Sequence, residues 1–359
     1  SDYRQAAIEA EYADGSWYCP LRYQGYRLIK GKPELAGLPA VYAAEEEAES
    51  LEIELADEAA GLHVYLLYGV LEKADVITRS VRVVNRGKEP VRLNRISSAS
   101  VDFEHASLEM LELPGAWGRE RYIARQKLHA GEQCIGSRRG ASSHQMNPFL
   151  ALLQPGADEV HGEVYGMNLV YSGNFHGGTE VDQLSRARVY LGMGDDDFSW
   201  LLEPSETFVS PEVVLVYTPD GLGEMSRIYH RVYRDHLVRG KYQYERRPVL
   251  VNNWEATYFD FNEEKILKLA DEAKELGIEL LVLDDGWFGK RNDDRSSLGD
   301  WFVNKDKLPD GIPELARKVN EKGLKFGLWM EPEMISKDSE LYRAHPDWCI
   351  HIPGRERLE

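Results

Sequence analysis

Acidic and aromatic residues recur at three places in the C-terminal third of the sequence, each at the end of a short apolar run. The three clusters are Asn252-Asn253-Trp254-Glu255, Asp284-Asp285-Gly286-Trp287 and Trp329-Met330-Glu331-Pro332-Glu333. Carboxylates accept hydrogen bonds from hydroxyl groups, and a Trp ring offers a flat apolar face. The clusters therefore indicate a binding site for a neutral, hydroxyl-rich ligand such as a sugar.

Simpler explanations compete with this interpretation. A Trp at a strand end is often part of the core, and Asp-Gly is often a turn, but three consecutive strands that end alike favour a site. Acidic clusters also bind Mg²⁺ or Ca²⁺, yet the sequence has no D-x-[DN]-x-[DN]-G loop and the Trp residues suit a sugar better. We therefore expect no metal and no cofactor. Asp293-Asp294 is interpreted as a solvated charge cluster. We expect few basic residues near the acidic groups of the site, so these groups would repel a phosphate-bearing ligand.

The elements that must position these clusters alternate between strand and helix. Apolar runs at 249–252, 280–283 and 326–329 are separated by segments of helical spacing at 263–276 and 312–320. Uniformly apolar strands that alternate with helices predict a parallel sheet covered on both faces, and ligands bind at the carboxyl ends of such strands. An open doubly wound sheet and a (β/α)8 barrel both fit. A full barrel needs about 250 residues, whereas this part, 247–359, has about 113.

The preceding part of the chain has a different pattern. Apolar and polar residues alternate strictly at 51–55 and less regularly at 62–67 and 76–84, and 213–216 is a continuous apolar run that suits a strand buried on both faces. Gly, Pro, Asn and Asp mark turns between such segments. This pattern predicts a large β-sandwich over 1–221. Helical spacing then begins at Leu222, so 222–246 is expected to form a connecting helix and a linker.

Composition narrows the class of protein. The 359 residues carry 61 acidic and 43 basic side chains, a net charge of −18, which argues against binding to nucleic acid or to an anionic membrane surface. No apolar run is long enough for a membrane-spanning helix. Cys19, Cys134 and Cys349 are too sparse for a disulfide framework, so reduced thiols and a cytoplasmic location are expected.

Longer segments of the sequence resemble the bacterial α-galactosidases of glycoside hydrolase family 36. In the C-terminal part they are NNWEA from Asn252, DDGWF from Asp284, LGDW from Leu298, GLWMEPEM from Gly327 and HPDW from His345. In the N-terminal part they are LPGAWGRER from Leu113 and SRRGASSH from Ser137. The likeness keeps the same order along the whole chain and is far more specific than a single motif.

The resemblance implies an N-terminal β-supersandwich followed by the first three strands and intervening helices of an incomplete (β/α)8 TIM barrel. It implies retaining hydrolysis of terminal α-D-galactosyl residues of raffinose-type oligosaccharides. In this family the nucleophile is the Asp of a Lys-Trp-Asp motif on the fourth barrel strand, and the acid/base Asp follows later. Neither motif occurs before Glu359. We therefore expect an N-terminally truncated fragment that lacks the catalytic pair and is inactive alone.

The resemblance assigns substrate binding to four residues of the barrel part. Asp284 and Asp285 match the Asp pair that binds galactose hydroxyl groups. Trp254 and Trp329 match Trp residues that wall the pocket. No catalytic residue is expected within this chain.

Three further residues carry different expectations. Trp117 matches a sandwich Trp that reaches the sugar site of a neighbouring subunit in tetrameric members, so a homotetramer is implied and Trp117 is counted as substrate-binding. Glu331 and Glu333 look like a catalytic pair, but the family places those roles elsewhere, and they stay unassigned.

Two other functions remain open. The family includes oligosaccharide synthases that pass galactosyl to another sugar, and a non-catalytic carbohydrate-binding protein would use the same Asp and Trp residues. Hydrolysis and transfer would differ in barrel loops that this sequence does not contain.

Overall fold

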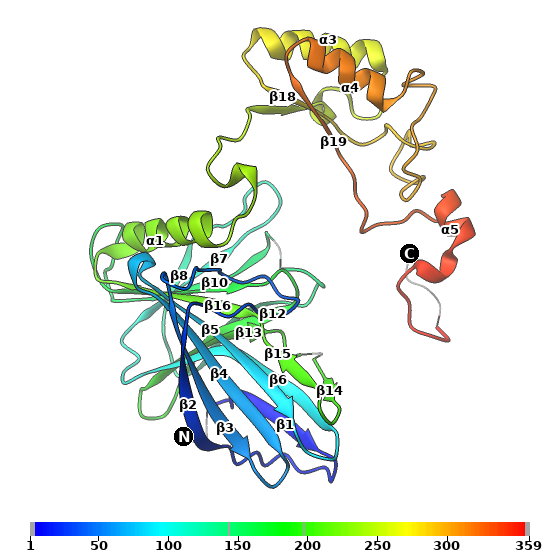
Figure 1. Cartoon of the computed structure of the whole chain (residues 1–359). Coiled ribbons are helices and arrows are strands. Elements are labelled where there is room, and N and C mark those ends of the chain that lie inside the picture. The colour runs from blue at the N-terminus through cyan, green and yellow to red at the C-terminus, as the bar shows by residue number, and fades with distance from the viewer. Residues whose placement is uncertain (1–3, 143, 197, 356–359) are drawn as a thin grey trace. The chain divides into compact units, whose positions relative to one another are not determined.

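The computed structural model describes residues 4–142, 144–196 and 198–355 (Figure 1). Ser143, within one of the matched segments, and 356–359 lie outside these ranges. The chain divides into two compact units, Ser1–Tyr244 and Glu245–Glu359.

The first unit contains two antiparallel sheets, as the alternating pattern predicts. The larger has the order β2-β3-β4-β5-β16-β11-β10-β7-β8, with β15 also paired to β5. Its strands are β2 (Arg22–Lys30), β3 (Glu49–Asp57), β4 (Leu62–Leu71), β5 (Val76–Asn85), β7 (Glu109–Pro114), β8 (Ala124–Lys127), β10 (Met146–Leu153), β11 (Val164–Val170), β15 (Thr207–Val209) and β16 (Glu212–Thr218). The strands expected at 51–55, 62–67, 76–84 and 213–216 are all present.

The smaller sheet has the order β1-β6-β13-β12-β9, with β14 also paired to β6. Its strands are β1 (Ile8–Tyr12), β6 (Val91–Phe103), β9 (Gly131–Ser137), β12 (Phe175–Val181), β13 (Ala187–Met193) and β14 (Trp200–Leu202). Two apolar clusters contain side chains from both sheets, for example Val83 with Leu93 and Leu150 with Leu191. The sheets therefore pack as a sandwich around a shared core.

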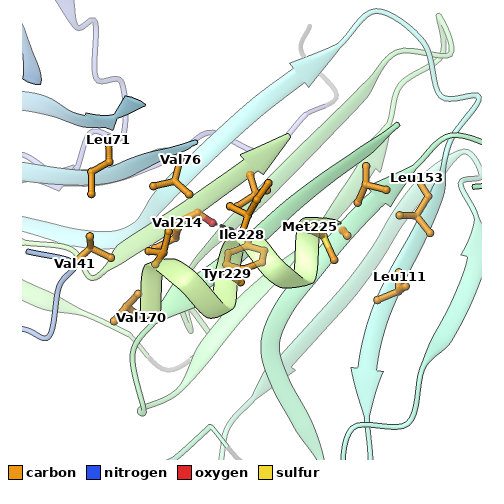
Figure 2. Packing of buried hydrophobic residues seen from close by; sticks show 14 of the residues in the cluster. Val41, Leu71, Val76, Leu111, Leu153, Val170, Val214, Met225, Ile228 and Tyr229 are labelled. Carbon is orange, nitrogen blue, oxygen red and sulfur yellow. Dashed lines mark hydrogen bonds between the residues drawn. The ribbon is translucent and has the colours of Figure 1, made fainter. Parts of the chain in front are cut away.

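Helix α1 (Gly221–His236) packs on the large sheet and belongs to the first unit (Figure 2). Met225, Ile228 and Tyr229 point from the helix toward the sheet, and the Tyr229 hydroxyl donates a hydrogen bond to the carbonyl oxygen of Val214 at 3.0 Å. The helix predicted from its spacing is present. Its apolar stripe makes it a layer of the sandwich.

A buried ion pair holds the loop between β2 and β3 against the same sheet. Lys32 Nζ lies 2.5 Å from Glu212 Oε1, and their side chains are only 4% and 2% exposed. Glu212 Oε2 also accepts a hydrogen bond from the main-chain N–H of Val41 at 2.8 Å. The Lys32 side chain passes close to Gly69, because a Cβ at that position would lie 3.3 Å from Lys32 Cδ. Burial raises the pKa of Glu212, while Lys32 acts in the opposite direction.

The second unit contains the predicted parallel sheet, β17 (Leu250–Asn252), β18 (Leu280–Leu283) and β19 (Lys325–Leu328). Leu281 is in register with Val251 on one side and Phe326 on the other. Helices α3 (Glu263–Glu275) and α4 (Ile312–Glu321) connect the strands and pack on them through Ile266, Ala270, Leu315 and Val319. The remaining short elements are η1 (Glu72–Ala74), η2 (Lys241–Gln243), α2 (Trp254–Thr257), α5 (Glu340–Ala344) and η3 (Pro346–Trp348).

Local sequence signals explain where the two long helices of this unit begin. The Asn262 side chain accepts a hydrogen bond from the N–H of Lys265, and Glu263 and Glu264 follow in the first turn of α3. Helix α4 begins after Gly311, whose φ of 84° suits glycine, with Pro313 in its first turn. Lys318 of α4 forms an ion pair with Glu263 of α3.

We predict that Lys32→Met lowers the free energy of unfolding by about 3–5 kcal/mol at neutral pH, because it leaves the Glu212 carboxylate buried without its cation. When a carboxyl group has a raised pKa in the folded state, its protonation stabilises the folded protein as the pH falls through that pKa. The difference in free energy of unfolding between the unmutated protein and Lys32→Met should therefore be smaller at pH 4.5 than at pH 7.5. Urea unfolding of both proteins at the two pH values measures it.

The matched control for this experiment is Lys73→Met. Lys73 is exposed, so its replacement should change stability by no more than about 0.5 kcal/mol. A Lys32→Met variant as stable as the control, or a deficit that grows at acid pH, would contradict the prediction.

Candidate functional site

The three strand ends meet at one edge of the parallel sheet. The N–H of Asn253 donates to the carbonyl oxygen of Val282 at 3.3 Å, and the N–H of Trp329 donates to that of Leu283 at 2.9 Å. The indole Nε1 of Trp287 donates to the carbonyl oxygen of Trp329 at 2.9 Å. These bonds place the clusters that follow β17, β18 and β19 side by side, as predicted for parallel strands.

Asn252 and Asn253 position Asp284. Asn252 Nδ2 donates a hydrogen bond to Asp284 Oδ2, and Asn253 Oδ1 accepts one from the main-chain N–H of Asp284 at 2.7 Å. Asp284 Oδ1 accepts from the N–H of Asp285 at 2.6 Å. Asn253 is 1% exposed, whereas Asp284 is only half-buried. The Asp284 carboxylate is thus oriented by neutral amides and still reaches solvent.

Asp285 has a different environment, because its carboxylate is buried against Arg291. Arg291 Nε lies 3.0 and 3.1 Å from the two carboxylate oxygens, and Nη2 lies 2.9 Å from Oδ2. The two residues are 6% and 4% exposed. Arg291 Nη1 donates to the carbonyl oxygen of Ser296 at 2.9 Å, and its guanidinium lies 5.6 Å from the ring centre of Phe259. This fork-shaped pairing fixes the carboxylate plane.

Lys307 is the second cation beside Asp285. Its ammonium donates to the carbonyl oxygens of Phe259, Gly286 and Arg291 at 2.9, 2.9 and 3.0 Å. Burial lowers the pKa of Lys307, and the negative charge of Asp285 opposes that shift. The expectation of few basic residues near the acidic groups is therefore wrong for Asp285.

Neither Arg291 nor Lys307 is predicted from the sequence as a site residue. No signal could have identified them, since a single basic residue in a loop has no periodic spacing, and Lys307 reaches a carbonyl group 48 residues away. Asp293 and Asp294, interpreted as solvated, are exposed.

The aromatic residues of the site are partly accessible. Trp254 and Trp329 are half-buried, and Trp254 contacts Tyr258 and Phe259 edge-on, with ring centres 5.1 and 5.0 Å apart. Trp287 is buried in the core instead. Trp254 and Trp329 can therefore offer apolar surface to a ligand, which Trp287 cannot.

Glu331 lies close enough to Asp285 to respond to its charge. Partial burial raises the pKa of Glu331, and the negative charges of Glu333 and Asp285 add to the shift. Glu331 thus belongs to the same acidic edge as the Asp pair.

Trp117, the site residue predicted in the first unit, is 84% exposed. It lies between β7 and β8 in a turn where Ala116 pairs with Arg119 and Gly118 has a φ of 76°. The turn holds the indole out from its own sandwich.

Two features are absent from the residues that the structure describes. No cluster of three or more His, Cys, Asp or Glu side chains there is arranged to hold a metal ion. No helix in 4–142, 144–196 or 198–355 combines the length and hydropathy that crossing a bilayer requires.

Comparison with known proteins gives matches over the whole chain. α-Galactosidase AgaA of Geobacillus stearothermophilus is 58% identical over 360 residues, covering 100% of this chain and 49% of the relative. α-Galactosidase 1 of Pediococcus pentosaceus is 48% identical over 355 residues, covering 99% of this chain and 48% of the relative. The crystal structure of AgaA superposes with a TM-score of 0.97 at 57% identity, covering 99% of this chain and 50% of that one. This chain therefore spans about half the length of the curated relatives it matches.

The same comparisons confirm the fold expected from the motifs, an N-terminal sandwich followed by part of a (β/α)8 barrel. Residues 207–359 match the Melibiase family. Residues 1–203 match the glycosyl hydrolase family 36 N-terminal domain. The chain belongs to glycosyl hydrolase family 36.

Proposed function

We propose that this chain forms the sugar-recognition part of a retaining α-galactosidase that hydrolyses terminal α-D-galactosyl residues of raffinose-type oligosaccharides. The observation that carries the proposal is the edge of the parallel sheet where Asp284, Asp285, Trp254 and Trp329 come together. The relative AgaA has been crystallised as variants in complex with raffinose and with stachyose, which supports oligosaccharides as the substrate class.

Sugar binding would divide between carboxylates and indoles. Asp284 and Asp285 would accept hydrogen bonds from galactose hydroxyl groups, and Trp254 and Trp329 would cover its apolar faces. We place the nucleophile and the general acid/base beyond Glu359, where this family carries them. Retaining glycosidases hold these two carboxyl groups about 5–5.5 Å apart, and Glu331 and Glu333 receive neither role.

The full-length protein, meaning this chain continued to the length of its relatives, is proposed to be a cytoplasmic homotetramer. Trp117 would then reach the sugar site of a neighbouring subunit. Its 84% exposure supports this role, because an aromatic side chain held away from its own core is available to another surface.

The first test compares the chain with the full-length protein. The full-length protein should release galactose from raffinose, and the 359-residue chain should be slower by about a thousandfold or more, because it lacks the nucleophile. Free galactose and transfer products are measured separately, which also distinguishes a hydrolase from a galactosyl-transferring synthase. Clear turnover of an aryl α-galactoside by the purified chain would refute the placement of the catalytic pair.

The second test separates the two Asp residues in the full-length protein. Asp284→Asn should weaken galactose inhibition about 10- to 150-fold, because a hydrogen bond to a charged group is worth about 1.5–3 kcal/mol. Its melting temperature should change little. Asp285→Asn should weaken binding too and also lower the melting temperature, since Arg291 would stay buried without its anion.

The exposed Asp294 supplies the matched control for that test. Asp294→Asn should leave both galactose inhibition and melting temperature unchanged. Unaltered inhibition in both Asp284→Asn and Asp285→Asn would show that the pair is structural only.

The third test concerns Trp117. In the full-length protein Trp117→Ala should raise KM about tenfold, a loss of ~1.4 kcal/mol, without lowering the melting temperature. Trp17, which is 56% exposed in the same unit, gives the control Trp17→Ala with unchanged KM. Equal KM values for the two variants would count against the role of Trp117, and light scattering of the unmutated protein checks the tetramer.

A further inference from the structure

Lys307 binds the loops that surround Asp285 through all three of its N–H groups. The carbonyl oxygens it contacts belong to Phe259, Gly286 and Arg291, at 2.9 to 3.0 Å. Gly286 follows Asp285 directly, and Arg291 is the residue whose guanidinium binds the Asp285 carboxylate. One buried side chain therefore fixes the main chain at both members of the Asp285–Arg291 pair.

The surroundings of Lys307 are shaped to the compact ammonium group. Gly286 has a φ of 95°, and a Cβ at that position would lie 3.2 Å from Lys307 Nζ. The ammonium also lies 4.7 Å from the ring centre of Phe261. Lys307 is 9% exposed, and with its three donors all engaged it leaves no unpaired polar hydrogen.

Stability alone does not account for a lysine here. Burying an ammonium group is costly, and an apolar side chain of similar volume is often equally stable or more so. What an apolar side chain could not do is hold three carbonyl groups of separate loop segments at fixed distances. Two of those carbonyl groups belong to the turn and the loop that orient the Asp285 carboxylate.

We propose that Lys307 is a positioning residue for sugar binding, which sets the orientation of the Asp285 carboxylate by fixing Gly286 and Arg291. This inference rests on the proposed function, because it assumes that Asp285 contacts the sugar. Lys307 itself contacts no substrate in this proposal. Lys307 acts by holding the Asp285–Arg291 pair in position.

The test uses Lys307→Met in the full-length protein, with galactose affinity measured by calorimetry and KM and kcat measured on an aryl α-galactoside. Affinity should fall, and KM rise, by about 10- to 100-fold. The matched control is Lys305→Met. Lys305 is exposed and donates to a single carbonyl oxygen, that of Pro309 at 3.1 Å, so its removal should leave affinity unchanged.

A double-mutant cycle distinguishes positioning from general destabilisation. If Lys307 acts through Asp285, Lys307→Met combined with Asp285→Asn should bind galactose no more weakly than Asp285→Asn alone. Losses that multiply in the double variant would overturn the proposal, as would unchanged affinity in Lys307→Met. If Lys307→Met does not fold, Lys307→Gln keeps two N–H donors and must show the same loss, and an unchanged affinity there also overturns it.

The outcomes separate this proposal from the proposed function. An unmutated full-length protein that binds galactose without releasing it from any α-galactoside would refute the proposed hydrolase while leaving the cycle measurable. An active unmutated protein whose Lys307→Met variant is equally active and binds galactose equally well would refute only the role of Lys307.

Discussion

The buried Asp285 carboxylate determines how the chain after β18 is arranged. A carboxylate that is removed from water needs a cation and hydrogen-bond donors nearby, and Arg291 supplies both through three N–H···O contacts. The chain must therefore turn back within six residues so that Arg291 reaches Asp285. Lys307 also fixes this loop, because it binds the carbonyl oxygen of Gly286, which follows Asp285, and that of Arg291 itself. The accessible Asp284 and Trp329 lie on the edge that this arrangement holds in place.

Regular elements could be predicted from the sequence because their signals are local. Alternation identified β3 to β5, apolar runs identified β17 to β19, and helical spacing identified α1, α3 and α4. The rule that parallel strands present ligands at their carboxyl ends placed Asp284 and Asp285 at one edge. The contacts of Arg291 and Lys307 could not be predicted, since they depend on loop geometry between residues that share no periodicity.

The position of α1 shows the same limit in the first unit. Its amphipathic pattern predicted a helix but not which surface its apolar stripe would cover. Met225 and Tyr229 complete the apolar cluster on the outer face of the large sheet, beside Val41 from the loop that Lys32 and Glu212 hold. A segment expected to link the units is therefore also a packing layer of the sandwich, and only tertiary contacts could reveal this.

Two adjacent carboxylates at one strand end repel each other, and the surroundings of the two side chains limit this repulsion in different ways. Asp284 is oriented by the amides of Asn252 and Asn253, which bring no net charge. Asp285 lies beside Arg291 and Lys307, whose positive charges offset the pair. At Glu331, burial raises the pKa, the negative charges of Glu333 and Asp285 add to that shift, and the positive charge of Arg291 opposes it. The cations beside Asp285 thus reduce the repulsion within the pair, while the Asp284 carboxylate stays accessible at the strand end.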